Sequence, residues 1–309
     1  MRTALLALTE ELKRLKAAGV KTVPVDDASL RALHAVVNAQ KEAAAQLPAP
    51  AAVQPESAPA HVEPTPAPSP VPAPRPPAAA PEPESNLPSA PIFTLPEGDK
   101  AVRWAALREH VLGDTVCQGR VRRGKQVVFG VGSLDASLMF IGEAPGAEEE
   151  VQGEPFVGPA GQLLTKMIAG MGLKREDVYI ANIMNWRPDL PTPAGGEQYG
   201  NRPPTPAEMA YCLPYLQAQI EVVKPSLLIA LGKTAAEGLL GPGAFRTLGE
   251  IRGKWREFRG TPLMVTYHPS YILRNATNRS KRMIWEDLLK VMERVGLPIS
   301  DKQRGYFLS

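Results

Sequence analysis

The sequence predicts an α/β domain in three layers, α/β/α, with a short and mostly parallel central sheet. Two observations predict it. Segments of strand and helix character alternate along residues 136–296, and the strand segments are continuously apolar. Such alternation favours parallel strands joined by helices, and continuous apolarity indicates strands that are covered on both faces. An N-terminal helical segment and a linker rich in proline and alanine precede this domain.

Residues 1–47 are expected to form the N-terminal helical segment. Leu5, Leu8, Leu12 and Leu15 recur at intervals of 3, 4 and 3, which places them on one face of a helix. A second helix is expected from about residue 28 to residue 46. Two readings of these helices stay open: an element that docks onto a protein partner, or a solvated helical hairpin without one.

Residues 48–91 are expected to be a disordered linker. Sixteen of the 33 prolines lie here, and Leu87 is the single leucine of this stretch. Such a composition buries too little apolar surface to fold. The 218 residues that follow, 92–309, are enough for one well-buried domain.

Within residues 92–309, each expected element has its own signal. Short apolar runs predict strands, and apolar residues at helical spacing predict helices. Thr205, Pro206 and Glu208 form a capping box that begins one of the helices. The expected strands are 136–142, 178–186, 226–232 and 261–270, and the expected helices are 161–172, 205–224, 233–241 and 280–296.

Composition argues against several protein classes. No apolar run approaches the ~20 residues that a membrane-spanning helix needs, and the N-terminus lacks the cleavage site of a signal peptide. Cys117 and Cys212 make no disulfide framework, so we expect a cytoplasmic protein. We also expect a monomer. Residues 92–309 hold 27 Lys and Arg against 23 Asp and Glu, and this net charge of +4 permits an anionic partner without requiring one.

Polar and aromatic side chains follow three of the expected strands where each strand ends. Glu143 follows the first strand, with Phe156 further along the same connection, Asn182 lies at the end of the second, and His268 follows the fourth. Each alone has an ordinary structural role open to it. Ligands bind outside the carboxyl ends of the strands in open α/β sheets, so three such strand ends together favour a site.

This set of groups suits the removal of a base from a nucleotide sugar. Breaking an N-glycosidic bond builds positive charge on the deoxyribose and negative charge on the departing base. A carboxylate with a positioned water can stabilise and trap the positively charged sugar, and an imidazole donor can stabilise the negatively charged base. An amide can read one edge of a pyrimidine, and an aromatic ring can stack on a flipped base. The sequence contains no P-loop, GxGxxG or HExxH motif.

Longer motifs carry a family resemblance over about residues 104–295. They are GEAPGAEEEVQGEPFVGPAGQLL (142–164), VYIANI…RP (178–188), NRPPTPAE…C (201–212), PSLLIALGKTAA (225–236), RGKW (252–255) and HPSYILR (268–274). In content and order they resemble the uracil-DNA glycosylase superfamily, most closely its type-4 branch. The resemblance implies a uracil-DNA glycosylase fold and the excision of uracil from DNA, the first step of base excision repair.

The resemblance also implies roles for residues of the pocket. Glu143 and the backbone of Ala144 would handle the catalytic water, and Glu149 would line the pocket near the base. Phe156 would stack on uracil, and Asn182 would read its polar edge.

Three further roles follow from the resemblance. Asn201 stands at the asparagine of the N-R-x-P segment and would belong to the catalytic set, and His268 would stabilise the leaving uracil anion. The loop 268–274 would bind DNA through Ser270, Leu273 and Arg274, with Leu273 as a wedge in the minor groove and Arg274 near a phosphate. The alternative for Leu273 is an ordinary core position.

Two departures from the family's pattern stand out. The family usually holds a [4Fe–4S] cluster on four cysteines, but here only Cys212 and, roughly, Cys117 correspond, with Trp186 at a third position. Two cysteines do not supply four thiolates, so we expect no metal or cofactor. Residues 189–200 are longer than usual and contain no His, so the covalent chemistry of a sister branch is not expected.

The expected protein is therefore a monofunctional uracil-DNA glycosylase. No lysine is expected at the pocket for Schiff-base lyase chemistry. Two alternatives stay open: an inactive or retuned member that binds DNA damage, and a repair adaptor that acts through its N-terminal helices and linker.

Overall fold

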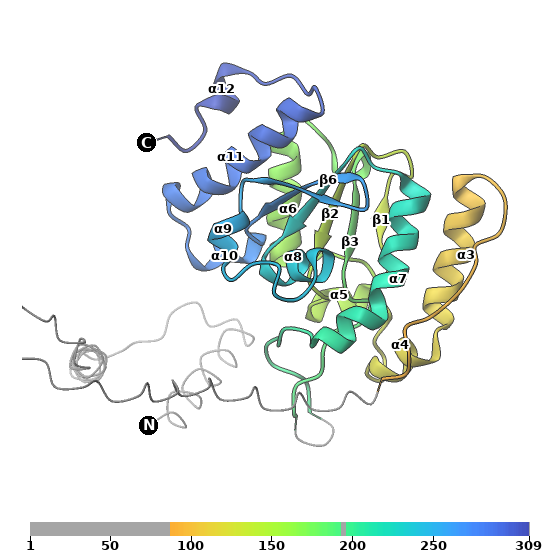
Figure 1. Ribbon diagram of the computed structural model, residues 1–309. Helices are drawn as coiled ribbons and strands as arrows, with labels where there is room; N and C mark the ends of the chain where they lie inside the picture. The colour runs from red at the N-terminus through yellow and green to blue at the C-terminus, as the bar shows by residue number, and fades with distance from the viewer. Residues whose placement is uncertain (1–86, 193–195, 309) are drawn as a thin grey trace, which may run out of the picture. The chain divides into compact units, whose positions relative to one another are not determined.

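The fold is built around a twisted sheet, seen in a computed structural model that describes residues 87–192 and 196–308 (Figure 1). The expected N-terminal helices and nearly all of the expected linker lie outside the described residues. Within them, the sheet has six strands in the order β1-β3-β2-β4-β6-β5. The strands are β1 (Val131–Gly132), β2 (Leu138–Gly142), β3 (Tyr179–Asn182), β4 (Leu227–Leu231), β5 (Trp255–Phe258) and β6 (Thr261–Thr266).

The four predicted strands form the centre of this sheet. β3, β2, β4 and β6 run parallel, while β1 and β5 pair antiparallel at the two edges. Every residue of β2, β3 and β4 is buried, as continuous apolar runs require. The prediction of a mostly parallel sheet is confirmed, and the two short edge strands are additional.

Helices cover both faces of the sheet, which confirms the three-layer arrangement (Figure 1). Neighbouring residues of a strand point to opposite faces. Phe140 therefore packs in the cluster that contains Leu164 and Leu288, and Ile141 packs in the one that contains Leu216. The first layer holds α6 (Pro159–Gly170) and α11 (Asn278–Arg294), and the second holds α7 (Pro206–Val223) and α8 (Lys233–Leu240).

Shorter elements complete the described structure. They are α3 (Lys100–Gly113), α4 (Thr115–Arg120), α5 (Ala147–Gln152), the 3₁₀ helix η1 (Arg175–Asp177), α9 (Leu248–Ile251), α10 (Pro269–Arg274) and α12 (Asp301–Arg304). Residues of α3 and α4 form a third core cluster with α7, in which Leu107, Cys117, Cys212 and Trp186 are buried. None of the helices in residues 87–192 and 196–308 is long and apolar enough to cross a membrane.

Two helix starts show how local sequence sets the structure. The predicted capping box of α7 is present, since Thr205 Oγ1 accepts from Glu208 N at 3.2 Å and Glu208 Oε2 accepts from Thr205 N at 2.7 Å. The expected loop after β6 is instead the short helix α10. Pro269 takes its first position, where no backbone N–H is needed, and His268 Nδ1 caps it by accepting from Ser270 N at 3.2 Å.

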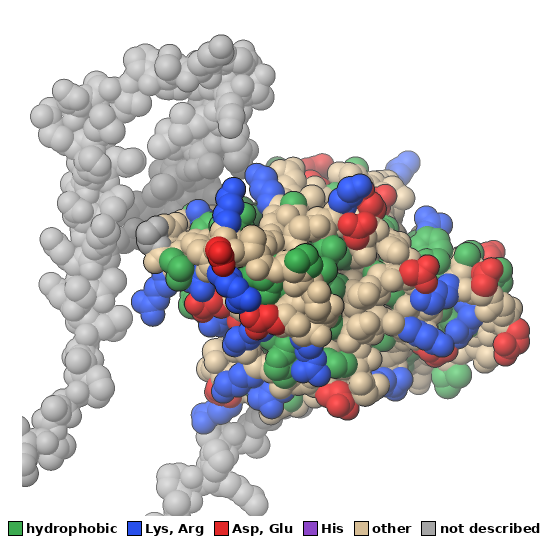
Figure 2. Space-filling model, turned by 90° about the horizontal axis from the view of Figure 1, so that it is seen from above, with side chains coloured by type: hydrophobic (Ala, Val, Ile, Leu, Met, Phe, Trp, Pro, Cys, Tyr) green, Lys and Arg blue, Asp and Glu red, His purple; other side chains and the backbone are tan. Residues whose placement is uncertain are grey.

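The surface carries both signs of charge. On the face seen from above in Figure 1, Lys and Arg side chains are interspersed with Asp and Glu (Figure 2). An interspersed pattern agrees with the small net charge of residues 92–309, and it leaves no large basic field on this face.

Candidate active site

A cleft of about 820 Å³ lies at the carboxyl ends of the parallel strands. α5 follows β2 there, α8 follows β4 and α10 follows β6. The cleft is lined by all ten candidate site residues of the sequence: Glu143, Ala144, Glu149, Phe156, Asn182, Asn201, His268, Ser270, Leu273 and Arg274. Parallel topology brings together residues that are up to 131 positions apart in the sequence.

Glu143 is a half-buried carboxylate directly after β2. Burial raises its pKa above the ordinary 4.5, the hydrogen bond with the Thr234 side chain opposes this rise, and the nearby charge of Glu237 adds to it. Thr234 belongs to α8, so a residue after β4 orients a group after β2. Such a carboxylate can accept a proton from a water molecule in the cleft.

His268 is held as a neutral donor. Burial lowers its pKa to about 4, and the positive charge of Arg274 lowers it further. Nδ1 accepts from Ser270 N at 3.2 Å and lies 2.9 Å from Ser270 Oγ. A backbone N–H can only donate, so the proton of the neutral ring is on Nε2. The ring centroid lies 5.5 Å from that of Phe156, so the donor and the aromatic ring share one wall.

Gly142 lets Phe156 and Asn182 meet at the floor of the cleft. A Cβ at Gly142 would lie 2.4 Å from Asn182 Oδ1 and 2.5 Å from two ring atoms of Phe156. Phe156 has φ 55°, the left-handed region that non-glycine residues rarely adopt, and such strain is found mainly at functional sites. The Asn182 carboxamide has no hydrogen-bond partner among residues 87–192 and 196–308, so its donor and acceptor are both available to a ligand.

Glu149 is a buried carboxylate on α5 at the wall of the cleft. Its Oε1 accepts from Gly158 N at 3.4 Å. A Cβ at Gly146 would lie 2.5 Å from Glu149 Oε2, so the glycine makes room for this side chain. The carboxylate thus stands between the starts of α5 and α6.

The cleft rim carries Leu273 and Arg274 on α10. The Leu273 side chain is 51% exposed, whereas Ile272 beside it is 6% exposed and packs in the core. The alternative of a core role for Leu273 is therefore wrong. Arg274 Nη1 donates to Ser270 Oγ at 3.2 Å, which links the rim arginine to the residue that contacts His268.

Sequence reasoning missed several residues of the cleft. It expected no lysine, but Lys233 lines the cleft, with its Nζ 3.2 Å from Glu237 Oε1. Lys233 and Thr234 lie at the start of α8, just after β4. This is the one parallel strand after which no site residue was expected, so the strand-end rule could have found them. Arg187 also lines the cleft, and its short sequence motif, Arg-Pro, carried no signal of its contacts.

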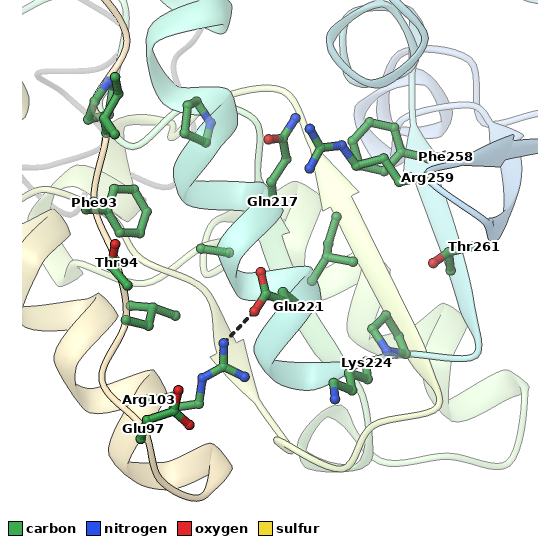
Figure 3. Close-up of a pocket in the computed structure, with 17 residues that line it drawn as sticks. Phe93, Thr94, Glu97, Arg103, Gln217, Glu221, Lys224, Phe258, Arg259 and Thr261 are labelled. Atoms are coloured by element: carbon green, nitrogen blue, oxygen red, sulfur yellow. Dashed lines mark hydrogen bonds and ion pairs between the residues drawn. The ribbon is translucent and has the colours of Figure 1, made fainter.

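A second cleft, of about 790 Å³, lies near the amino ends of the strands (Figure 3). The segment 91–97, α7 and the turn between β5 and β6 line it. Arg103 and Glu221 line it and pair with each other at 2.5 Å. Strand topology places ligands at the opposite end of the sheet, so the chemistry is assigned to the first cleft.

Comparison with known proteins decides the family. The model of the uracil DNA glycosylase superfamily matches residues 129–289, just over half of the chain. The chain belongs to the uracil-DNA glycosylase superfamily. A type-4 uracil-DNA glycosylase of Thermotoga maritima is 40% identical over 183 residues, which cover 59% of this chain and 89% of the relative.

Two further relatives support a position of this chain near the type-4 branch of the superfamily. A type-4 uracil-DNA glycosylase of Archaeoglobus fulgidus is 41% identical over 152 residues, 47% of this chain and 71% of the relative. A type-5 uracil-DNA glycosylase of Pyrobaculum aerophilum is 28% identical over 178 residues, 53% of this chain and 72% of the relative. The resemblance expected from the motifs is confirmed.

The expectation of no cofactor is wrong as a conclusion about this glycosylase. The family resemblance implies a [4Fe–4S] cluster, and the similarity to type-4 relatives overturns an inference that rested on counting cysteines. The thiols of Cys117 and Cys212 contact each other, and this contact and burial raise the pKa of Cys117. Two thiols do not fit a four-thiolate cluster, and residues 87–192 and 196–308 hold no group of three or more His, Cys, Asp or Glu that could bind a metal. The reaction is assigned to side chains of the cleft.

Proposed function

We propose that this chain is a uracil-DNA glycosylase that hydrolyses the N-glycosidic bond of uracil in DNA and so begins base excision repair. The observation that supports it most is the convergence of Glu143, Phe156, Asn182 and His268 in one cleft. Membership of the superfamily and the names of the type-4 relatives support the same reaction.

Base selection is assigned to Phe156 and Asn182. The flipped uracil stacks on the Phe156 ring. The Asn182 amide then faces its polar edge, where Oδ1 accepts from uracil N3–H and Nδ2 donates to O4. Cytosine has no N3–H and carries a donor in place of O4, so both hydrogen bonds are lost.

Bond cleavage is assigned to Glu143 and His268. The C1′–N1 bond breaks and its electron pair leaves with the base as the uracil anion. His268 Nε2–H donates a hydrogen bond to the anion's O2. A water oxygen bonds to C1′, and its proton passes to the ionised Glu143. The uracil anion then takes up a proton from solvent and Glu143 returns its proton to solvent, so the products are neutral uracil and an abasic sugar with a hydroxyl group on C1′.

The proposal is tested with the purified full chain and four oligonucleotides that differ in one base: uracil, cytosine, thymine or hypoxanthine. Chromatography of the released bases should detect free uracil from the first oligonucleotide, with an abasic site left in the strand. Binding of uracil-containing DNA without release of base would support the alternative of an inactive damage-binding protein.

The pH dependence should follow Glu143. Its carboxylate must be ionised to accept a proton, and its pKa is raised above 4.5, so the rate should fall as the pH drops through that raised pKa. His268, with its pKa lowered to about 4, is mainly neutral above about pH 5. Single-turnover rates from pH 4.5 to 9 check this, and Glu143→Gln should remove the acidic limb. An unchanged acidic limb in that variant would assign it to another group.

Leu273 should matter for duplex DNA and little for single strands. Flipping a base out of a duplex costs a few kcal/mol of unstacking, and a wedge offsets that cost. Because Leu273 is 51% exposed, Leu273→Ala should leave the melting temperature nearly unchanged. Duplex excision should slow about tenfold. The matched control is Ile272→Ala, which removes a buried neighbour and should lower the melting temperature. Equal slowing on both substrates by Leu273→Ala would contradict the wedge role.

Residues 92–309 are proposed to be the catalytic domain, joined by the linker 48–91 to a segment 1–47 that recruits a protein partner. The protein is proposed to act as a cytoplasmic monomer. Deletion of residues 1–91 should leave the excision rate within about twofold, because all the cleft residues lie after residue 142. Loss of excision in the deleted chain, with its melting temperature preserved, would overturn the boundary.

A further inference from the structure

We propose that Arg187, held by Glu150, is a positioning residue for Asn201. Arg187 orients the Asn201 amide so that its Nδ2 can donate a hydrogen bond to an acceptor oxygen of the bound nucleotide. This inference rests on the proposed glycosylase function and names a device within the same cleft.

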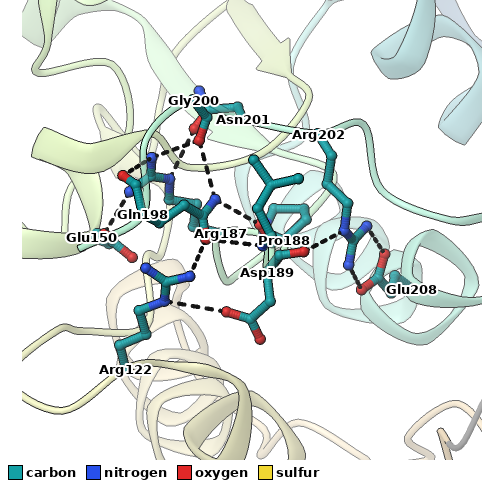
Figure 4. A network of polar contacts seen from close by, with 11 residues as sticks. Arg122, Glu150, Arg187, Pro188, Asp189, Gln198, Gly200, Asn201, Arg202 and Glu208 are labelled. Carbon is teal, nitrogen blue, oxygen red and sulfur yellow. Dashed lines mark hydrogen bonds and ion pairs between the residues drawn. The ribbon is translucent and has the colours of Figure 1, made fainter. Parts of the chain in front are cut away.

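Arg187 and Glu150 form a buried ion pair beside the cleft (Figure 4). Arg187 Nη1 lies 2.8 Å from Glu150 Oε1, and the two side chains are 5% and 6% exposed. Glu150 belongs to α5, directly after Glu149 of the cleft wall, and Arg187 follows β3. A buried pair is stable only when its remaining polar atoms are also bonded.

The other hydrogen bonds of Arg187 go to Asn201 and to the residues just before it. Nη2 donates to Gly200 O at 2.8 Å and to Gln198 O at 3.4 Å. Nε donates to Asn201 Oδ1 at 2.8 Å. One guanidinium therefore connects α5 to both the backbone and the side chain of this segment, as Figure 4 shows.

The chemistry of arginine determines which way the Asn201 amide turns. A guanidinium has five donors and no acceptor, so the atom that faces Nε must be the amide oxygen. Nδ2 is then directed away from Arg187, and within the described residues it has no hydrogen-bond partner. Asn201 is exposed and lines the cleft, so its available group is a donor, suited to a carbonyl, sugar or phosphate oxygen of the nucleotide.

Gln198 also helps to hold the segment that carries Asn201. Its side chain is buried, and its Nε2 donates to Pro188 O at 3.1 Å and to Gly200 O at 3.2 Å. Its Oε1 accepts from Leu190 N at 3.1 Å and from Arg122. The two ends of the segment 189–200 are thereby joined, which fixes the backbone that carries Asn201.

A double-mutant cycle tests the proposal, with single-turnover excision of uracil from an oligonucleotide as the readout. Asn201→Ala and Arg187→Lys should each slow excision about tenfold, as expected for one lost or misdirected hydrogen bond. Lysine keeps the positive charge beside Glu150 but lacks the planar fork. In the Asn201→Ala background, Arg187→Lys should have no further effect beyond about twofold. A further tenfold loss there would overturn the positioning role.

Asn201→Asp separates the donor from the contact with Arg187. The carboxylate keeps an oxygen for Arg187 Nε and provides no donor, so the melting temperature should hold while excision falls at least as far as in Asn201→Ala. A rate near that of the unaltered protein would overturn the donor assignment. If Arg187→Lys fails to fold, Glu150→Gln serves in the same cycle, because it removes the charge that holds the Arg187 guanidinium and should slow excision only while Asn201 is present.

The matched control is Arg282→Lys on α11. Arg282 also makes several hydrogen bonds, to Glu286 Oε1, Arg304 O and Tyr306 O, but it lies outside the cleft. Arg282→Lys should lower the melting temperature and leave the excision rate unchanged. Absence of uracil release by the unaltered protein would count against the glycosylase function itself. If the unaltered protein releases uracil but the effects of Arg187→Lys and Asn201→Ala simply add in the double variant, only the positioning role would be contradicted.

Discussion

Replacing His268 with alanine is expected to slow uracil excision by about 100- to 1,000-fold, the usual loss for one donor to a developing anion. The neutral ring, with its pKa lowered to about 4 and its Nδ1 bonded to Ser270 N, offers Nε2–H without a prior protonation step. Single-turnover rates on a uracil oligonucleotide check the expectation.

The control for His268 is His110→Ala. His110 lies on α3, where its ring packs against Phe93 and Tyr215, outside the cleft. It should alter the melting temperature and leave the rate within about threefold. Similar rates for His268→Ala and the unaltered protein would remove His268 from the reaction.

Asn182→Ala is expected to reduce both the excision rate and the choice of base. Two hydrogen bonds to the uracil edge, at about 1.4 kcal/mol each, correspond to about 100-fold in rate. Because cytosine gains nothing from Asn182, the ratio of uracil to cytosine excision should fall by the same factor. Rates on the two oligonucleotides, measured with excess enzyme, give this ratio directly.

Asn185→Ala provides the matched control for Asn182. Asn185 is also a buried asparagine after β3, but its Nδ2 donates to Val128 O at 3.0 Å and it does not line the cleft. Its loss should lower stability without changing base choice. An unaltered uracil-to-cytosine ratio in Asn182→Ala would show that another group reads the base.

The centre of the fold was predictable because its signals are local. Continuous apolar runs such as Leu227–Leu231 favour buried parallel strands, and the capping box at Thr205 and Glu208 marks a helix start. The edge strands were missed for the opposite reason. β1 has two residues, and the two middle residues of β5 are the exposed Arg256 and Glu257, so neither strand has a continuous apolar run.

The candidate site could be predicted only to the level of strand ends. Topology brings Glu143, Asn182 and His268 to one edge, and the sequence contains that information. It does not contain the partner of each group. Thr234 beside Glu143 and Glu150 beside Arg187 depend on the packing of α8 and α5, which no spacing in the chain reveals.

The short helix α10 shows an intermediate case. Pro269 after His268 carries a helix-start signal, but the segment is only six residues long and follows a strand directly. The His-Pro turn and the family resemblance predict a loop here. The helical form explains why Ile272 is buried while Leu273 and Arg274 reach the rim, since successive residues of a helix point in different directions.

The most direct measurement of the central claim is free uracil released by the unaltered chain and by the Glu143→Gln/His268→Ala double variant. Both are incubated in excess over a uracil-containing single strand, and the released base is quantified against the abasic product. We predict one uracil released per strand by the unaltered chain, and none above background over the same time by the double variant, with its melting temperature preserved. Equal release by both proteins would contradict the assignment of the reaction to this cleft.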